Sequence, residues 1–253
     1  MTPDDWLSRT RLLLGDESLN KLRSSNVLIV GLGGVGSWAA ELICRAGVGK
    51  MTIIDGDKVS ATNRNRQLPA LKSTEGSFKV DIMASRLRDI NPDLDLTTVI
   101  EFIKHERIEE ILSEPFDYVV DAIDTLTPKV FLIYHSVTKK YRIVSSMGAG
   151  GRIAPEKISV CDLSETTDCP LARILRKKLH RLGVGEGVTA VYSPEPVDKA
   201  RILPAEGERN KASVVGTISY MPAAFGIMCA SVVISGLLDG LSPNSREEGQ
   251  ALP

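Results

Sequence analysis

The stretch Asn26-Val-Leu-Ile-Val-Gly-Leu-Gly-Gly-Val-Gly-Ser37 contains a continuous apolar run that ends in a cluster of glycines. A short apolar run closed by glycine is typical of a strand buried on both faces. Gly31, Gly33 and Gly36 have G-x-G-x-x-G spacing, and a helical pattern follows from Ser37. Between a strand and a helix, this spacing lets backbone N–H groups approach a phosphate. It predicts a nucleotide site and leaves NAD and ATP both open.

Strand and helix patterns alternate on both sides of this stretch. We expect strands at residues 26–30, 51–55, 94–100, 116–120 and 142–145, and helices at 16–23, 37–46, 77–90, 105–112 and 127–140. Such alternation builds parallel βαβ units with right-handed crossovers. We therefore predict an α/β fold, with a Rossmann-like, mostly parallel sheet and helices on both faces.

The pattern changes after Gly148-Ala-Gly-Gly151, where shorter strands, a basic helix and proline-rich loops follow. These features predict that antiparallel strands continue the sheet in the C-terminal half. Because no linker-like segment separates the halves, we predict a single domain over residues 1–253. Its nucleotide-binding half is expected at 1–150, and its substrate and dimerisation half at 151–253.

The composition fits one globular domain. The chain has 253 residues, of which 43% are hydrophobic and 25% charged, and its formal net charge is −1. These values exclude collagen, coiled-coil and disordered classes, and any nucleic-acid binding must come from a local basic patch. The four cysteines, Cys44, Cys161, Cys169 and Cys229, show no C-x-x-C spacing. We therefore expect neither a disulfide framework nor zinc.

Residues 212–238 carry no charge and are long enough to span a bilayer. Gly216, Pro222 and Gly236 interrupt them, so we predict a strand or loop and then a buried helix of small residues from about Met221. The acidic N-terminus has no signal-peptide pattern. We expect a cytoplasmic protein without stable membrane insertion, and leave peripheral membrane association open.

Charged and amide side chains follow the second and fourth predicted strands. Asp55 ends the second strand, and Asn63-Arg-Asn-Arg66-Gln67 lies beyond it. Lys79 opens the next helix, and Asp124 follows the fourth strand. The carboxyl ends of parallel strands are where open α/β sheets bind ligands. Two cations for phosphates and an acid for Mg²⁺ favour ATP over NAD.

Together these motifs resemble the ubiquitin-activating-enzyme-like adenylyltransferases of the ThiF type, over roughly residues 5 to 240. The matching segments are Val30-Gly-Leu-Gly-Gly-Val-Gly36, Ala46-Gly-Val-Gly49, Asp55-Gly-Asp57, Asn63-x-x-Arg66-Gln67, Lys79 and Asp121-Ala-Ile-Asp124. The resemblance implies a set of nucleotide-binding residues, which are Gly31, Gly33, Gly34, Gly36, Asp55, Asp57, Asn63, Arg66, Gln67, Lys79, Asp124 and Thr125.

The resemblance also assigns roles. Asp55 is expected to bind the ribose, and Asp124 the metal. Arg9, Arg66, Lys79 and Asp124 are the expected catalytic residues. Arg9, rather than Arg11, matches an N-terminal arginine that reaches the ATP of the partner subunit in homodimers of the family.

Two departures narrow the choice within the family. The zinc-binding C-x-x-C pairs of the sulfur-carrier enzymes are absent, and residues 184–219, where the thioester cysteine is expected, contain no cysteine. Cys169 is the remaining candidate for a thioester. Segments 64–67, 144–153 and 162–173 resemble more specifically the tRNA threonylcarbamoyladenosine dehydratases. These enzymes use ATP to cyclise N6-threonylcarbamoyladenosine at position 37 of tRNA.

That chemistry needs no protein thioester. Adenylation gives the carboxylate a good leaving group, and a neighbouring group of high effective molarity closes the ring. The alternative function is activation of the C-terminus of a ubiquitin-like sulfur carrier. A non-catalytic nucleotide sensor and an NAD-dependent oxidoreductase are the other classes that we considered.

The predicted helix over 169–182 carries a basic stripe that includes Arg173, Arg176, Lys177 and Arg181. Such a stripe suits RNA phosphates, although a solvated amphipathic helix gives the same pattern. No aromatic residue for base stacking accompanies it. The expected partners are a tRNA substrate and a second copy of the chain. A cysteine desulfurase or sulfur-acceptor system is left open as a further partner.

Overall fold

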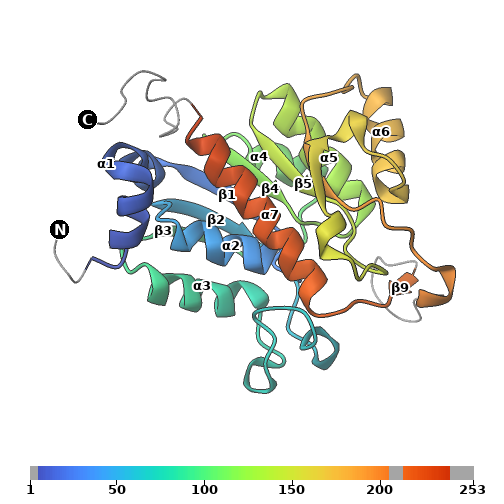
Figure 1. Cartoon of the computed structure of the whole chain (residues 1–253), viewed down its shortest axis with the longest axis horizontal. Coiled ribbons are helices and arrows are strands. Elements are labelled where there is room, and N and C mark those ends of the chain that lie inside the picture. The colour runs from blue at the N-terminus through green and yellow to red at the C-terminus, as the bar shows by residue number, and fades with distance from the viewer. Residues whose placement is uncertain (1–4, 205–212, 240–253) are drawn as a thin grey trace, which may run out of the picture.

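A seven-stranded sheet in the order β3-β2-β1-β4-β5-β7-β6 runs through the molecule (Figure 1). The computed structural model describes residues 5–204 and 213–239. The strands are β1 Asn26–Val30, β2 Lys50–Ile54, β3 Asp95–Val99, β4 Tyr118–Asp121, β5 Ile143–Ser146, β6 Ser159–Asp162 and β7 Thr189–Tyr192. A separate antiparallel pair comprises β8 Ile202–Pro204 and β9 Ser213–Val215.

The predicted α/β fold is confirmed, with one difference in the C-terminal half. Strand β6 pairs antiparallel with β7, as expected, but β7 itself pairs parallel with β5. The end of β6 lies beside the start of β7, where Asp162 pairs with Thr189, so the segment that contains α6 leaves and re-enters the sheet at the same end. The carboxyl ends of β1, β2, β4, β5 and β7 therefore share one edge of the sheet.

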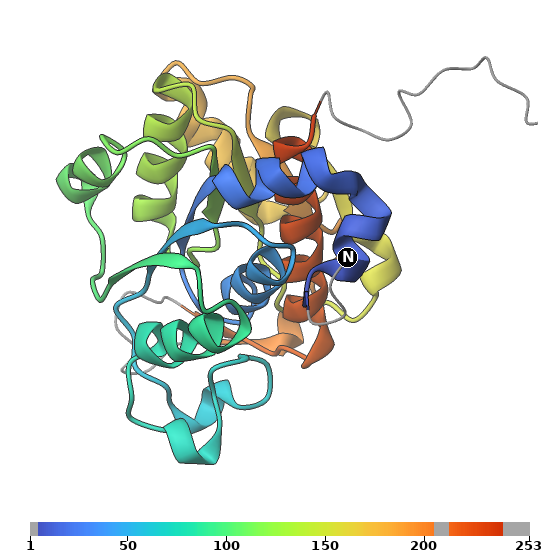
Figure 2. The same ribbon diagram turned by 90° about the vertical axis from the view of Figure 1, so that its left-hand side faces the viewer.

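Helices cover both faces of the sheet (Figure 2). They are α1 Ser8–Ser24, α2 Gly36–Arg45, α3 Lys79–Ile90, α4 His105–Ile111, α5 Leu126–Thr138, α6 Pro170–Arg181 and α7 Tyr220–Leu237. Successive side chains of β1 point to opposite faces, as in any strand. Val27 and Ile29 belong to a core cluster that includes residues of α2, α3 and α7, whereas Leu28 and Val30 belong to one that includes residues of α4, α5 and α6.

Helix α7 is the helix of small residues that we predicted in the uncharged stretch. Within the described part of the chain, it is the one helix long and apolar enough to cross a membrane, and 44% of it is buried. Its buried side packs on α2, where a Cβ at Gly226 would lie 2.6 Å from the Val35 carbonyl oxygen and 2.7 Å from the Trp38 Cβ. Glycine thus allows α7 to lie against α2 as a core helix.

The N-terminal helix begins earlier than predicted. We expected a helix over 16–23, but α1 starts at Ser8 and kinks at Gly15, whose φ is 82°. That conformation favours glycine, so a helix can resume after it. Arg11 pairs with Asp5 at 2.8 Å and with Asp16 at 3.0 Å, joining the two sides of the kink.

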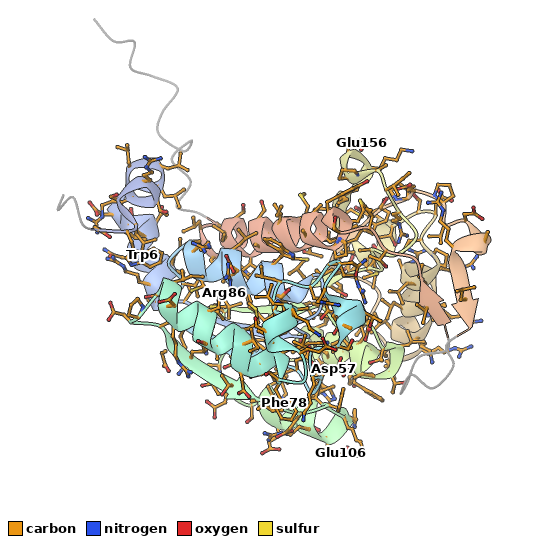
Figure 3. The ribbon with its side chains drawn as sticks, turned by 90° about the horizontal axis from the view of Figure 1, so that it is seen from below. Trp6, Asp57, Phe78, Arg86, Glu106 and Glu156 are labelled. Carbon is orange, nitrogen blue, oxygen red and sulfur yellow. The ribbon has the colours of Figure 1, made fainter. Side chains whose placement is uncertain are left out.

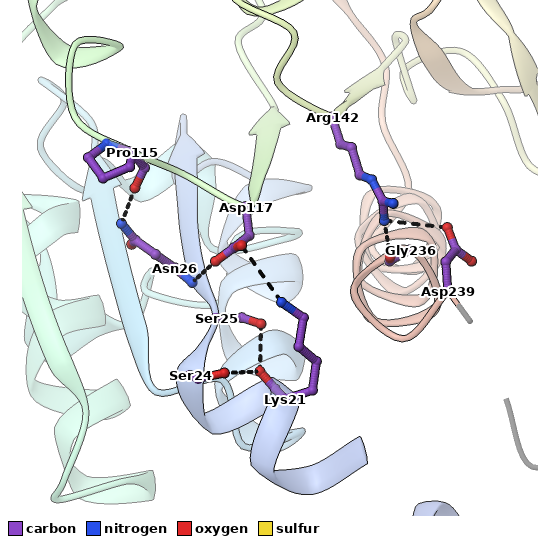
Figure 4. A network of polar contacts seen from close by, with 9 residues as sticks. All are labelled: Lys21, Ser24, Ser25, Asn26, Pro115, Asp117, Arg142, Gly236 and Asp239. Carbon is purple, nitrogen blue, oxygen red and sulfur yellow. Dashed lines mark hydrogen bonds and ion pairs between the residues drawn. The ribbon is translucent and has the colours of Figure 1, made fainter. Parts of the chain in front are cut away.

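Polar contacts tie the elements together at the amino ends of the strands (Figure 4). The Asn26 backbone N–H donates to Asp117 Oδ2 at 2.7 Å, which joins the start of β1 to the turn before β4. Arg142, before β5, donates to the Gly236 carbonyl near the end of α7 and lies 3.4 Å from the Asp239 carboxylate. The predicted ligand-binding residues follow the opposite ends of these strands.

Candidate nucleotide-binding site

The glycine loop connects β1 to α2 and lies close to the segment after β4. Gly31 has a φ of 92°, and a Cβ there would lie 2.6 Å from the Ala122 carbonyl oxygen. A Cβ at Gly36 would lie 1.8 Å from the Gly31 carbonyl oxygen, so no side chain fits at either position. The loop therefore leads into the N-terminus of α2 as bare backbone, an arrangement suited to phosphate.

Asp55 joins the end of β2 to this loop. Its carboxylate accepts hydrogen bonds from the Leu32 N–H at 2.6 Å and from the Asp57 N–H at 2.7 Å. Burial raises the pKa of Asp55, and the positive charge of Lys79 opposes that shift. Each carboxylate oxygen can accept a further hydrogen bond, so the group retains acceptor capacity for the ribose hydroxyls predicted to bind it.

Lys79 supplies a buried cation beside the loop. It is the first residue of α3, and its backbone N–H donates to the Asp57 carbonyl oxygen at 3.0 Å. Its Nζ lies 2.8 Å from Asp57 Oδ2, and the Lys79 side chain is 5% exposed against 52% for Asp57. An ammonium has three N–H donors, and the pair with Asp57 uses one of them.

The segment from Ser60 to Gln67 lies against the glycine loop. Asn63 Oδ1 accepts from the Ser60 N–H at 3.1 Å and so shapes this turn. Arg66 Nη1 donates to the Thr62 carbonyl and to Asn65 Oδ1, both at 2.9 Å. These bonds hold the predicted phosphate-binding arginine in place.

Gln67 has a buried side-chain oxygen beside the glycine loop. Its Oε1 is buried and has no hydrogen-bond partner among the described residues. Its Nε2 lies 3.9 Å from the position that a Cβ on Gly33 would take. A buried polar atom without a partner costs about 1–3 kcal/mol.

The segment after β4 is held by a buried cluster. Asp121 Oδ2 accepts from Ser145 Oγ at 2.7 Å and lies 2.8 Å from Lys129 Nζ. Lys129 also donates to the Ile123 carbonyl at 3.2 Å. Asp124 follows as an exposed residue, and Thr125 is the residue that precedes α5.

Our sequence analysis missed Lys129 and Ser145. A signal for Lys129 was present, since it is a lysine on the otherwise apolar face of the predicted helix over 127–140. A charge at such a position needs a buried partner.

Arg9 lies apart from the other predicted site residues of its own chain. Leu7, two residues before Arg9, packs against Gly47. Gly47 follows the C-terminal end of α2, which is the end farther from the glycine loop. Figure 3 shows Trp6 at one end of the molecule, well away from Asp57, which pairs with Lys79. Arg9 is exposed, whereas Arg11 is engaged with Asp5 and Asp16.

The predicted RNA-binding residues divide into two kinds. Arg176 Nη1 donates to the Thr166 carbonyl at 2.7 Å and also to the Thr166 hydroxyl, so it holds the turn after β6. Arg173, Lys177 and Arg181 are exposed on α6. Arg176 thus has a structural role that the sequence did not indicate.

Arg152 is a second buried cation that sequence reasoning did not single out. Its guanidinium donates to the carbonyls of Ser193, at 3.2 Å, and Gly148, so it braces the turn after β5. Its Nη2 lies 3.7 Å from Cys169 Sγ, and Cys169 is only 5% exposed. The thiol considered for a thioester therefore faces Arg152 inside the protein.

Comparisons with known proteins find relatives along nearly the whole chain. A model of the ThiF family matches residues 7–249. The tRNA threonylcarbamoyladenosine dehydratase of Bacillus subtilis (strain 168) is 35% identical over 238 residues, which cover 91% of this chain and 94% of that protein. The crystal structure of E. coli tRNA N6-threonylcarbamoyladenosine dehydratase, TcdA, in complex with ATP matches with a TM-score of 0.84 at 35% identity. That match covers 95% of this chain and 98% of TcdA.

Similarity to a sulfur-carrier enzyme is shorter. The molybdopterin-synthase adenylyltransferase of Haemophilus influenzae is 37% identical over 106 residues, or 42% of this chain and 43% of that protein. The match to the dehydratases therefore extends over more than twice as much of the chain.

Proposed function

The chain belongs to the ThiF family, and we propose that it is an enzyme that uses ATP to dehydrate N6-threonylcarbamoyladenosine in tRNA. The observation that carries this proposal is the similarity to dehydratases along nearly the whole chain, including one solved with ATP. The match to a sulfur-carrier adenylyltransferase covers less than half of the chain. The dehydratase function is therefore favoured over activation of a ubiquitin-like protein.

The site residues divide the work of binding ATP. The bare glycine loop and the N-terminus of α2 are suited to the phosphates, and Asp55 to the ribose. Lys79 and Arg66 would bring positive charge to the triphosphate. Gln67 Oε1, buried without a partner among the described residues, would accept a hydrogen bond from a hydroxyl or amino group of the bound nucleotide, because phosphate oxygens cannot donate.

Asp124 would hold Mg²⁺ together with the phosphates of ATP. In residues 5–204 and 213–239, no group of three or more His, Cys, Asp or Glu side chains is arranged to bind a metal. The Asp124 carboxylate and the ATP phosphates form a donor set that fits Mg²⁺, which commonly binds through one or two carboxylates, substrate phosphates and retained waters. When bound, Mg²⁺ would neutralise negative charge on the triphosphate.

The chemistry is then the adenylation of the threonyl carboxylate. A carboxylate oxygen attacks the α-phosphorus of ATP, and pyrophosphate leaves. The neighbouring carbamoyl group next attacks the activated carbonyl carbon and closes the ring. AMP leaves with the carboxylate oxygen, and the carbamoyl group gives up an N–H proton to solvent. The tRNA has then lost the elements of one water. Lys79 and Arg66 stabilise the charge that develops on the phosphates, and proximity within one nucleoside favours ring closure.

Exchange of labelled pyrophosphate into ATP tests which carboxylate is activated. We expect exchange when the protein is given Mg²⁺ and tRNA that contains threonylcarbamoyladenosine, and none with the same tRNA lacking the modification. Exchange that requires a ubiquitin-like protein with a C-terminal Gly-Gly, and not the tRNA, would support the alternative function instead.

A further inference from the structure

A cavity lies between α6 and the turn that leads into β7. Its volume is about 440 Å³, within the range of small-molecule sites of roughly 300–1,000 Å³. Apolar side chains of Leu163, Leu179, Val184 and Val188 contribute to its lining. The remaining lining residues are Ser164, Arg173, Arg176, Lys177, His180, Gly185 and Glu186. The cavity therefore combines an apolar lining with basic groups.

The cavity is separate from the nucleotide-binding site. Asp162 Oδ2 accepts from the N–H groups of Gly187 and Val188, at 2.8 and 3.0 Å, and fixes the turn at the cavity. This turn precedes Thr189, the first residue of β7, and β7 runs parallel to β5. The turn therefore lies at the amino ends of the parallel strands, whereas the glycine loop follows the carboxyl end of β1.

The two exposed cations at the cavity are suited to an anion. Arg173 and Lys177 are four residues apart on α6, so they lie on the same side of the helix. Arg176 is already engaged with Thr166, and Glu186 is the acidic residue in the lining. Because the chain as a whole has a net charge of −1, this basic character is local.

We propose that this cavity binds a nucleotide of the substrate tRNA other than the one that reacts. Its backbone phosphate would lie at Arg173 and Lys177, and its base would rest on the apolar lining. A guanidinium plane can also stack on an RNA base, and unpaired nucleotides of RNA are commonly bound in this way. The proposal rests on the proposed function, since it names where the same tRNA substrate is held.

Charge reversal on α6 tests the proposal with a matched control. The test variant is Arg173→Glu/Lys177→Glu. The control is Lys140→Glu/Lys178→Glu, which makes the same change in charge at exposed residues outside the cavity lining. We expect the test variant to weaken tRNA binding by about tenfold or more and to reduce the slope of log K against log salt by about 1.5, as for two lost phosphate contacts.

The kinetic readout separates binding from chemistry. In the test variant, KM for tRNA should rise while kcat and ATP affinity stay within about twofold, because the cavity lies away from the reacting atoms. The control variant should change tRNA binding by less than about threefold. Glu186→Lys should tighten tRNA binding, since it replaces the acidic lining residue with a cation.

Three outcomes would overturn the proposal. Equal weakening by the test and control variants would mean that only the general positive charge of this surface matters. A fall in kcat with unchanged tRNA affinity would place these residues in the chemistry. Unchanged tRNA binding together with loss of an acidic protein partner would identify a protein-docking surface. If the proposed function itself is wrong, the protein without substitutions will neither bind nor dehydrate the tRNA.

Discussion

Lys129 and Asp121 form an ion pair of 2.8 Å in which both side chains are completely buried. Lys129 also donates to the Ile123 carbonyl, and Asp121 accepts from the Ser145 hydroxyl and from the Ile123 N–H. These bonds fix the first residues after β4. Asp124 lies at the surface, but these bonds hold the turn that precedes it.

We predict that Lys129→Met destabilises the protein by about 3–5 kcal/mol, because it leaves the Asp121 carboxylate buried without its cation. The double variant Asp121→Asn/Lys129→Met should recover much of this loss in urea unfolding. Its adenylation activity should stay low, since the bond from Lys129 to the Ile123 carbonyl is still missing. A single variant that unfolds like the unmodified protein would contradict the importance of the pair.

Gln67→Leu should separate ligand binding from stability. The change removes a buried oxygen that has no partner among the described residues, so the ligand-free protein should be as stable as before or more stable. ATP with Mg²⁺ should raise the melting temperature of the unmodified protein, by about 2.7 kcal/mol of stabilisation at 100 times Kd, and should raise that of the variant less. NAD should raise neither. Equal stabilisation by NAD and ATP would contradict the assignment of the site.

The histidine pair between α4 and α5 predicts a pH dependence of stability. His135 is 7% exposed, and its Nε2 lies 3.1 Å from that of His105. Burial, and then His105, lower the pKa of His135 below its usual 6.5, with Lys139 acting in the same direction and Glu109 against it. The folded state therefore favours the neutral ring.

The sign of the effect follows from linkage. The unfolded chain takes up the proton more readily than the folded protein does. The contribution of His135 to the free energy of unfolding is therefore fully present above about pH 6.5, and it decreases as the pH falls toward the lowered pKa. Urea unfolding at about pH 7.5 and about pH 5.5 should give a smaller loss for His135→Gln than for the unmodified protein. The same loss in both proteins would mean that His135 does not contribute.

Arg9 is predicted to complete the ATP site of a partner subunit. The structure places it away from the glycine loop of its own chain, and a two-fold dimer would let each subunit lend the same residue to the other. Arg9→Ala and Asp124→Asn should each be inactive alone. After mixing and exchange they should regain activity, because some heterodimers have one site without either defect.

The controls for this experiment are simple. Arg23→Ala, at an exposed arginine farther along α1, should be as active as the unmodified protein. If Arg9 acted within its own subunit, every site in the mixture would carry a defect and activity would stay low. A fully active monomer would also contradict the prediction.

Much of the nucleotide-binding half could be predicted from the sequence, because its signals are local. The apolar run before Gly31 and the glycine spacing after it define β1 and the start of α2 together. Asp55, Lys79 and Asp124 could be assigned to one edge because strand ends in a parallel sheet coincide. The orphaned oxygen of Gln67 lies beside the same loop.

Other features depend on distant contacts and were therefore not predicted. The ion-pair partner of Lys129 is Asp121 on β4, and the periodicity of the helix that contains Lys129 says nothing about that strand. Arg176 has the spacing of a surface cation, but the turn at Thr166 offers it two acceptors. The early start of α1 was hidden because Gly15 reads as a helix break, whereas its positive φ allows the helix to continue after a kink.

The most direct test of the account is the mass of the modified nucleoside. Transfer RNA that contains N6-threonylcarbamoyladenosine should be incubated with the protein, ATP and Mg²⁺, digested under mild conditions and measured by mass spectrometry. The account predicts a nucleoside lighter by one water, formed with AMP and pyrophosphate, and none with Asp124→Asn or without ATP. A nucleoside of unchanged mass, with protein that is folded and binds ATP, would contradict it.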